Sequence, residues 1–144
     1  MKIFYILLFV TYTGLSYSQS IILTSPTTIT DGLLTPPNTD VTNDTITYCV
    51  NDLTNLFNGG NVLVINNTAS SMDIKVTRMA DQYACFTLNQ FCWTLCYSEG
   101  TSESPQATTI AAYDSSSIFH GWVTPNGNEG CCFIKYRFFD ANNP

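Results

Sequence analysis

Cysteines are the residues of this 144-residue sequence with the widest chemical repertoire, and three of the six fall between Cys85 and Cys96. Such a set can bind a metal, supply a nucleophile or form disulfides. A metal site would need further ligands at a regular spacing, but the single histidine, His120, is distant in the sequence. A nucleophile would need a nearby base, for which His120 is again the sole histidine. Disulfides are therefore predicted for Cys49, Cys85, Cys92, Cys96, Cys131 and Cys132.

The N-terminus supports this prediction because it indicates an oxidising compartment. A basic Met1-Lys2 start is followed by an apolar run to Leu15 and by small residues at Ser16 and Ser18. This is the layout of a secretory signal peptide over residues 1–18, and the run is shorter than the about 20 apolar residues of a membrane-spanning helix. The mature chain is expected to be secreted and extracellular, where disulfides persist and free thiols are rare.

The sequence leaves the disulfide pairing open, since six cysteines allow about fifteen schemes. Cys131 and Cys132 are adjacent and point to opposite sides of a strand, so a bond between them is not expected. Cys92 and Cys96 are expected on one face of a single strand, too far apart to bond. Cys49, Cys131 and Cys132 should then supply partners for at least some of Cys85, Cys92 and Cys96.

Short segments of strand-like sequence recur along the chain and predict an all-β fold. A Thr/Pro-rich lead-in is expected over residues 19–44, with a first strand in IILTSP, and a β-sandwich domain over residues 45–140. SMDIKVTRM alternates apolar and polar residues and indicates a half-buried strand. Further strands are predicted at 44–50, 61–66, 82–88, 91–97, 107–113, 117–123 and 130–139. Leu53, Leu56 and Phe57 have helical spacing before Gly59-Gly60, which predicts one short helix near 52–58.

The cysteine-rich stretch is predicted to be a hairpin centred on Asn89-Gln90. In that register Phe91, Trp93 and Leu95 lie on an apolar face with Ala84, Phe86 and Leu88, and the cysteines share the other face with Thr87 and Thr94. Trp93 is therefore expected to be buried and Thr94 exposed.

Two fold families suit parts of this pattern. Asp81 to Cys85 resembles the Tyr-x-Cys of an immunoglobulin F strand, although Cys49 lies closer to it than that fold expects and no Trp follows at the strand C position. The closing strands after SSSIFHGWV equally suit a CUB-like jelly roll. The expected architecture is an antiparallel, disulfide-stapled β-sandwich, immunoglobulin-like or jelly-roll, and neither resemblance covers enough of the chain to assign a family.

Charge and surface residues restrict the partners. Loss of the signal peptide leaves a net charge of 4 − 11 = −7, which disfavours nucleic acid and anionic membranes. The sequons at Asn43 and Asn66 predict glycosylation on the surface. Tyr97 and Trp122, near strand ends, are the candidates for an exposed binding surface. No cofactor or metal motif is present, so none is predicted.

The leading functional hypothesis is a small secreted, non-enzymatic module that binds an extracellular protein or glycan. The first alternative is a structural component of a matrix or coat. The second is a secreted hydrolase that uses His120 as its acid–base group, which would need a nucleophile or carboxylate beside that residue.

Signal cleavage gives the first testable prediction. Because the small residues Ser16 and Ser18 occupy the positions that signal peptidase reads, N-terminal sequencing of secreted protein should begin at Gln19. A first residue before Thr13 would contradict the signal-peptide assignment.

Overall fold

The computed structural model describes residues 20–25, 36, 38–42, 54, 56–58, 61–79, 88–127 and 134–144. Within these residues the chain forms strands and no helix, and the strands make two antiparallel sheets. The predicted signal peptide, Asn43 and the cysteines at 49, 85, 131 and 132 lie outside the described residues.

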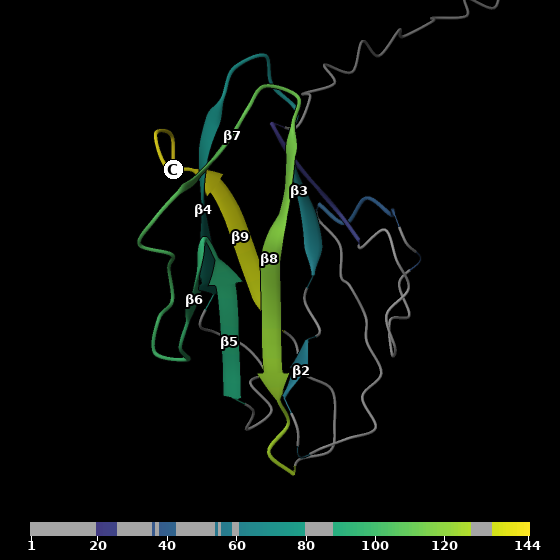
Figure 1. The fold of residues 1–144 in the computed structure, drawn as a ribbon, viewed down its shortest axis with the longest axis vertical. Helices are drawn as coiled ribbons and strands as arrows, with labels where there is room; N and C mark the ends of the chain where they lie inside the picture. Colours follow the sequence, from purple (N-terminus) through teal and green to yellow (C-terminus); the bar gives the residue numbers. More distant parts are fainter. Residues whose placement is uncertain are drawn as a thin grey trace, which may run out of the picture.

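The larger sheet is built around the long strand β8 (Ser115–Thr124). Its order is β1-β3-β8-β5-β6, and β2 also pairs with β8 (Figure 1). The bounds of these strands are Ile21–Thr24 for β1, Phe57–Asn58 for β2, Val62–Asn66 for β3, Leu88–Trp93 for β5 and Leu95–Tyr97 for β6. β1 belongs to this sheet although it lies in the segment predicted as the lead-in, because Ile21 to Thr24 pair with Asn66 to Leu63 of β3.

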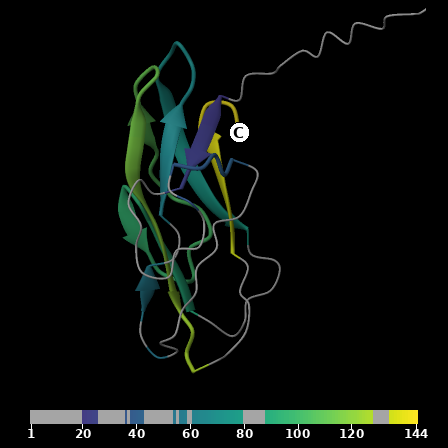
Figure 2. The same ribbon diagram turned by 90° about the vertical axis from the view of Figure 1, so that its right-hand side faces the viewer.

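The smaller sheet has the order β7-β4-β9, with bounds Thr108–Ile110 for β7, Met72–Met79 for β4 and Lys135–Asp140 for β9. β4 shows the alternation that its sequence predicts: Met72, Ile74 and Val76 are buried, and the residues between them are half-buried. The edge-on view places β5 and β8 on one side of the molecule and β9 on the other (Figure 2).

One hydrophobic cluster draws side chains from both sheets. Val64, Phe91, Trp93 and Phe119 come from the larger sheet, and Met72, Ile74, Val76 and Ile110 come from the smaller one. Aromatic rings of β9 complete it: Phe138 lies edge-on to Trp93 at 5.8 Å and to Phe119 at 5.0 Å between ring centroids. Edge-to-face contacts at these separations add to the free energy of burial.

A β-bulge in β8 turns Phe119 toward this cluster. Val62 pairs with Phe119, but Val64 pairs with Ser116, so β8 has one more residue than β3 between these two pairs. In a regular strand, residues three apart would point to opposite faces. The extra residue brings Ser116 and Phe119 to the same face and leaves Ile118 exposed.

A buried polar network also joins the two sheets. The Asn89 side chain of β5 donates to the Trp122 carbonyl at 2.9 Å and to the Tyr136 hydroxyl of β9 at 3.0 Å. The Arg78 guanidinium of β4 donates to the Asn89 side-chain oxygen at 3.0 Å. Burial raises the pKa of Tyr136 above its usual value, while the Asn89 hydrogen bond and the Arg78 charge oppose that rise.

The predicted helix near 52–58 is wrong, since Phe57–Asn58 forms β2 and pairs with Val123 and Trp122 of β8. The helical pattern spanned only two turns, and a helix of that length is marginal without tertiary support. Pairing with β8 places Phe57 and Asn58 in a strand instead.

The predicted hairpin about Asn89-Gln90 is also wrong. Both residues lie inside β5, where their backbones pair with Val123 and Trp122 of β8. The chain turns at Thr94 instead, which has a φ of 62°. The predicted strand 91–97 is therefore split into the end of β5 and the strand β6.

Burial follows the predicted faces only in part. Phe91 and Trp93 are fully buried and Thr94 is exposed, as expected. Leu88 and Leu95 were expected in the core but are 46% and 57% exposed, because one lies at the start of β5 and the other directly after the turn.

Truncation of Trp93 should destabilise the protein far more than truncation of its neighbour. Trp93→Ala removes a buried ring and leaves the Ile74 carbonyl, which accepts from Trp93 Nε1 at 2.8 Å, without that donor. It should cost about 3–5 kcal/mol of unfolding free energy. Thr94→Ala loses only an exposed hydroxyl contact to Thr108 and should cost less than about 1 kcal/mol. Denaturant unfolding with disulfides intact measures both, and equal costs would contradict the burial of Trp93.

Candidate functional site

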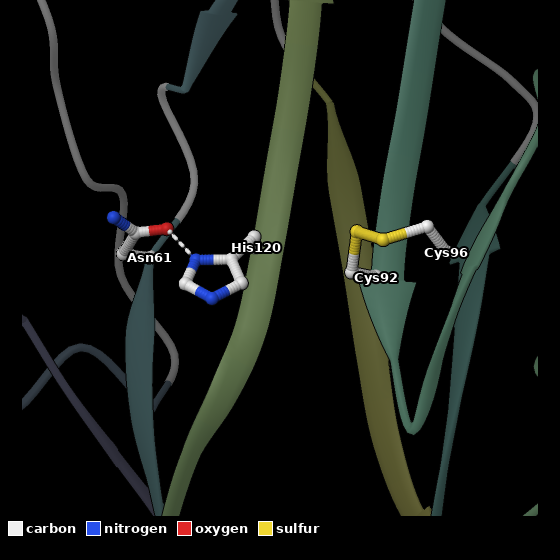
Figure 3. Close-up of a disulfide and its surroundings, with 4 residues drawn as sticks. All are labelled: Asn61, Cys92, Cys96 and His120. Carbon is white, nitrogen blue, oxygen red and sulfur yellow. Dashed lines mark hydrogen bonds between the residues drawn. A yellow bond between two sulfur atoms is a disulfide. The ribbon is translucent and has the colours of Figure 1, made fainter.

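The outer face of the larger sheet carries a disulfide and the single histidine. Register pairs Cys92 of β5 with His120 of β8, and Cys92 is bonded to Cys96 of β6 (Figure 3). Trp122 follows His120 on the same face, with 6.5 Å between their ring centroids. Within the described residues, this face is one of two places that gather side chains capable of chemistry or binding.

The Cys92–Cys96 bond corrects the sequence-based exclusion of this pair. That exclusion assumed one continuous strand, in which residues four apart are too distant to bond. Because the chain reverses at Thr94, the two residues are partners across the β5–β6 pair, with a Cα–Cα distance of 3.9 Å. Cys92 is 8% exposed, whereas Cys96 is exposed to solvent.

His120 is half-buried and its Nδ1 lies 2.7 Å from the side-chain oxygen of Asn61. Figure 3 shows its ring turned toward Asn61, on the side of β8 away from the disulfide. A hydrogen bond to an amide orients the ring and selects its tautomer, but it does not provide a nucleophile. In the described part of the chain, no group of three or more His, Cys, Asp or Glu side chains is arranged to hold a metal ion.

The two aromatic residues predicted to form a binding surface do not lie together. Tyr97 pairs with Phe91 on the core side of the larger sheet, and their rings are 5.2 Å apart. Its hydroxyl donates to Gln106 Oε1 at 2.8 Å. Trp122 is half-buried and pairs with Gln90, the neighbour of Phe91, so it lies on the opposite face.

The second place is an open groove of about 550 Å³ between the start of β1, the β3–β4 connection and the end of β9. Hydroxyl groups are the commonest polar groups of its lining, and a cation, a carboxylate and an amide lie among them. Its lining comprises Ser20, Ile21, Thr42, Thr68, Ser70, Ser71, Met72, Arg137, Phe138, Phe139, Asp140 and Asn143.

The polar groups of β9 give the groove both donors and acceptors. The Arg137 guanidinium lies over the ring of Phe139, 5.2 Å from its centroid, and Arg137 is exposed. Asp140 Oδ1 accepts from the backbone N–H of Asn142 at 3.0 Å, which fixes the turn that follows the strand. Sequence reasoning missed this groove because its residues are spread from 20 to 143 and none of the contributing segments has a binding motif.

The sequon residue Asn66 is fully buried at the end of β3. Its Nδ2 donates to the carbonyls of Ser70, Ile110 and Ala111 at 2.8, 3.0 and 2.9 Å. Its Oδ1 accepts from the Thr68 backbone at 3.0 Å and from the Thr68 hydroxyl at 2.7 Å. The nitrogen that would carry a glycan is therefore committed to structural hydrogen bonds, and the predicted glycan at Asn66 does not fit the folded chain.

Comparison with known proteins gives no relative: no protein-family model, no curated protein and no solved structure matches this chain. Among the residues that the structure describes, there is no helix of the length and apolarity needed to cross a membrane.

Glycan mapping should separate the two sequons. Because the Asn66 amide is buried and bonded, the peptide containing it should be recovered without a glycan from secreted, folded protein. Mass spectrometry of peptides before and after N-glycosidase treatment makes this measurement, and Asn43 is the remaining site for any N-glycan found. A glycopeptide at Asn66 would contradict the burial described here.

Proposed function

We propose that this protein is a small secreted, non-enzymatic module that binds an extracellular glycan or protein partner through the β1–β9 groove. We define the β1–β9 groove as the open site between the start of β1, the β3–β4 connection and the end of β9. The observation that carries the proposal is the chemistry of this groove. It combines hydroxyls on several segments with Arg137, Asp140 and Asn143.

The lining suits a polar, largely uncharged ligand. Ser hydroxyls both donate and accept hydrogen bonds, Arg137 only donates and the Asp140 carboxylate only accepts. The hydroxyls of Thr42 and Thr68 already donate to Asp40 and Asn66. One cation and one carboxylate nearly cancel in charge, so the groove lacks the excess of positive charge that a strongly anionic ligand requires. The half-buried Phe139 adds an apolar surface under Arg137. A sugar or a polar peptide segment presents the hydroxyl, amide and carbonyl groups that match this set.

The scaffold of the proposal is a disulfide-stapled β-sandwich, of immunoglobulin-like or jelly-roll type. Two antiparallel sheets with one shared hydrophobic cluster support a sandwich. In such a fold, connections gather at the ends of the sheets and carry binding sites on a rigid support. The β1–β9 groove has this location, because the β3–β4 connection and the turn after β9 both line it.

Variants within the groove test this proposal. Arg137→Ala removes the exposed donor, and Ser71→Trp places a large ring where an exposed small side chain lines the groove. Each should weaken binding at least about tenfold, equivalent to about 1.4 kcal/mol. Binding is measured on a glycan array and by capture from extracellular material with identification of the captured protein.

Matched controls make the same changes of charge and size at positions outside the groove. Lys135→Ala removes an exposed cation from the same strand as Arg137. Ser98→Trp places the same ring on an exposed loop position that does not line the groove. Both controls should bind as the unmodified protein does. Unchanged binding in Arg137→Ala and Ser71→Trp, with native circular dichroism, would refute the groove as the binding site. Self-assembly without ligand binding would favour a matrix or coat component.

A further inference from the structure

The Cys92–Cys96 bond is placed differently from a purely structural disulfide. It lies on the outer face of the larger sheet and joins β5 to β6, where the order of the described strands ends (Figure 3). The bond connects two unequal environments, since Cys92 is 8% exposed and Cys96 is exposed on a three-residue strand. Leu95, next to Cys96, is 57% exposed, so the approach to this strand from solvent is open.

The disulfide contributes little to the stability of the folded state. Its two cysteines are four positions apart, so it closes a very short loop. In the chain-entropy model the stabilisation grows with the length of the closed loop, so this bond stabilises the folded state at the low end of the range for disulfides. A cross-link that constrains so little of the unfolded chain adds little to the free energy of unfolding.

Other contacts hold the β5–β6 turn in place on both sides of the bond. Before the turn, the Trp93 indole donates to the Ile74 carbonyl in the core. At the turn, the Thr94 hydroxyl lies 2.6 Å from that of Thr108. After the turn, the Tyr97 hydroxyl donates to Gln106. Opening the disulfide therefore leaves the turn anchored to β4, to β7 and to the loop before β7.

We propose that Cys92–Cys96 is a site of thiol–disulfide exchange with an extracellular thiol, and that Cys96 is the sulfur that is attacked. A thiolate from a low-molecular-weight or protein thiol attacks Cys96 Sγ. The Cys92–Cys96 bond breaks, a mixed disulfide forms between Cys96 and the incoming sulfur, and the electron pair leaves on Cys92 as a thiolate. The external thiol is the sole co-reactant, and no net oxidation occurs.

The difference in exposure between the two cysteines determines which sulfur is attacked. Attack on a disulfide requires access to the sulfur that receives the nucleophile, and Cys96 is the accessible member of the pair. The displaced Cys92 stays within the sheet at its ladder position opposite His120. Cys92 is therefore the resolving sulfur: it can attack the mixed disulfide and release the external thiol again.

The first experiment uses the secreted mature protein with its disulfides mapped. Reduced glutathione is added, the reaction is stopped with iodoacetamide, and cysteine-containing peptides are analysed by mass spectrometry. In the earliest product, Cys96 should carry glutathione and Cys92 should carry the carbamidomethyl group. The near-ultraviolet circular dichroism spectrum should stay native. Mapping that joins either residue to another cysteine would overturn the proposal, as would glutathione that appears only when the protein unfolds.

A pair of single variants tests the direction. In Cys92→Ala the remaining Cys96 thiol is exposed, and in Cys96→Ala the remaining Cys92 thiol is buried. Mixed-disulfide formation with glutathione disulfide should be at least about tenfold faster at Cys96 than at Cys92. Equal rates, or faster reaction at Cys92, would overturn the assignment of Cys96. Should either variant fail to fold, the order of modification in the unmodified protein decides the same point.

Discussion

The hydrogen bond from the Trp93 indole to the Ile74 carbonyl fixes how the two sheets meet. Trp93 is fully buried, and a buried indole N–H without an acceptor would cost about 1–3 kcal/mol. Its acceptor lies on β4, the central strand of the smaller sheet, so the bond sets the position of β5 against that sheet. Phe138 packs edge-on against the same indole and brings β9 into the arrangement.

Two buried asparagines extend this constraint to other parts of the fold. Asn89 links β5 to β8 and β9 through its side-chain amide, and Asn66 links the end of β3 to the carbonyls at the end of β7. An amide that uses both its oxygen and its nitrogen is satisfied in the interior, and its loss would leave several backbone groups unpaired. Asn66 also orders Thr68, a residue that lines the β1–β9 groove, so the same buried amide supports the groove.

The sequence predicts those parts of the fold in which local pattern and long-range packing agree. The alternation of buried and half-buried residues along β4 belongs to this class. The β5–β6 turn does not, because Asn89-Gln90 has the composition of a turn but pairs with β8, and the turn itself falls on a β-branched threonine. The interactions that decide this region come from Ile74, Thr108 and Trp122, which are remote in sequence.

The candidate sites were predictable to different degrees for the same reason. Cysteine composition and compartment indicated disulfides, but the pairing depended on where the chain reverses. A turn at Thr94, rather than at Asn89-Gln90, makes Cys92 and Cys96 cross-strand partners. The β1–β9 groove depended wholly on which distant segments the sheets bring together. No sequence motif could therefore predict the groove.

The order of the larger sheet separates the two sites along that sheet. The β1–β9 groove includes Ile21 of β1, and the disulfide joins β5 to β6, at the other end of the order β1-β3-β8-β5-β6. A ligand in the groove and a thiol bonded to Cys96 would then be held at the same time, and a partner that presents both would gain from the effective concentration of the second contact. The hydrogen bonds that anchor the β5–β6 turn are made with Ile74, Thr108 and Gln106, none of which lines the groove. The link between the two sites is the core contact of Phe138, a groove residue, with the ring of Trp93.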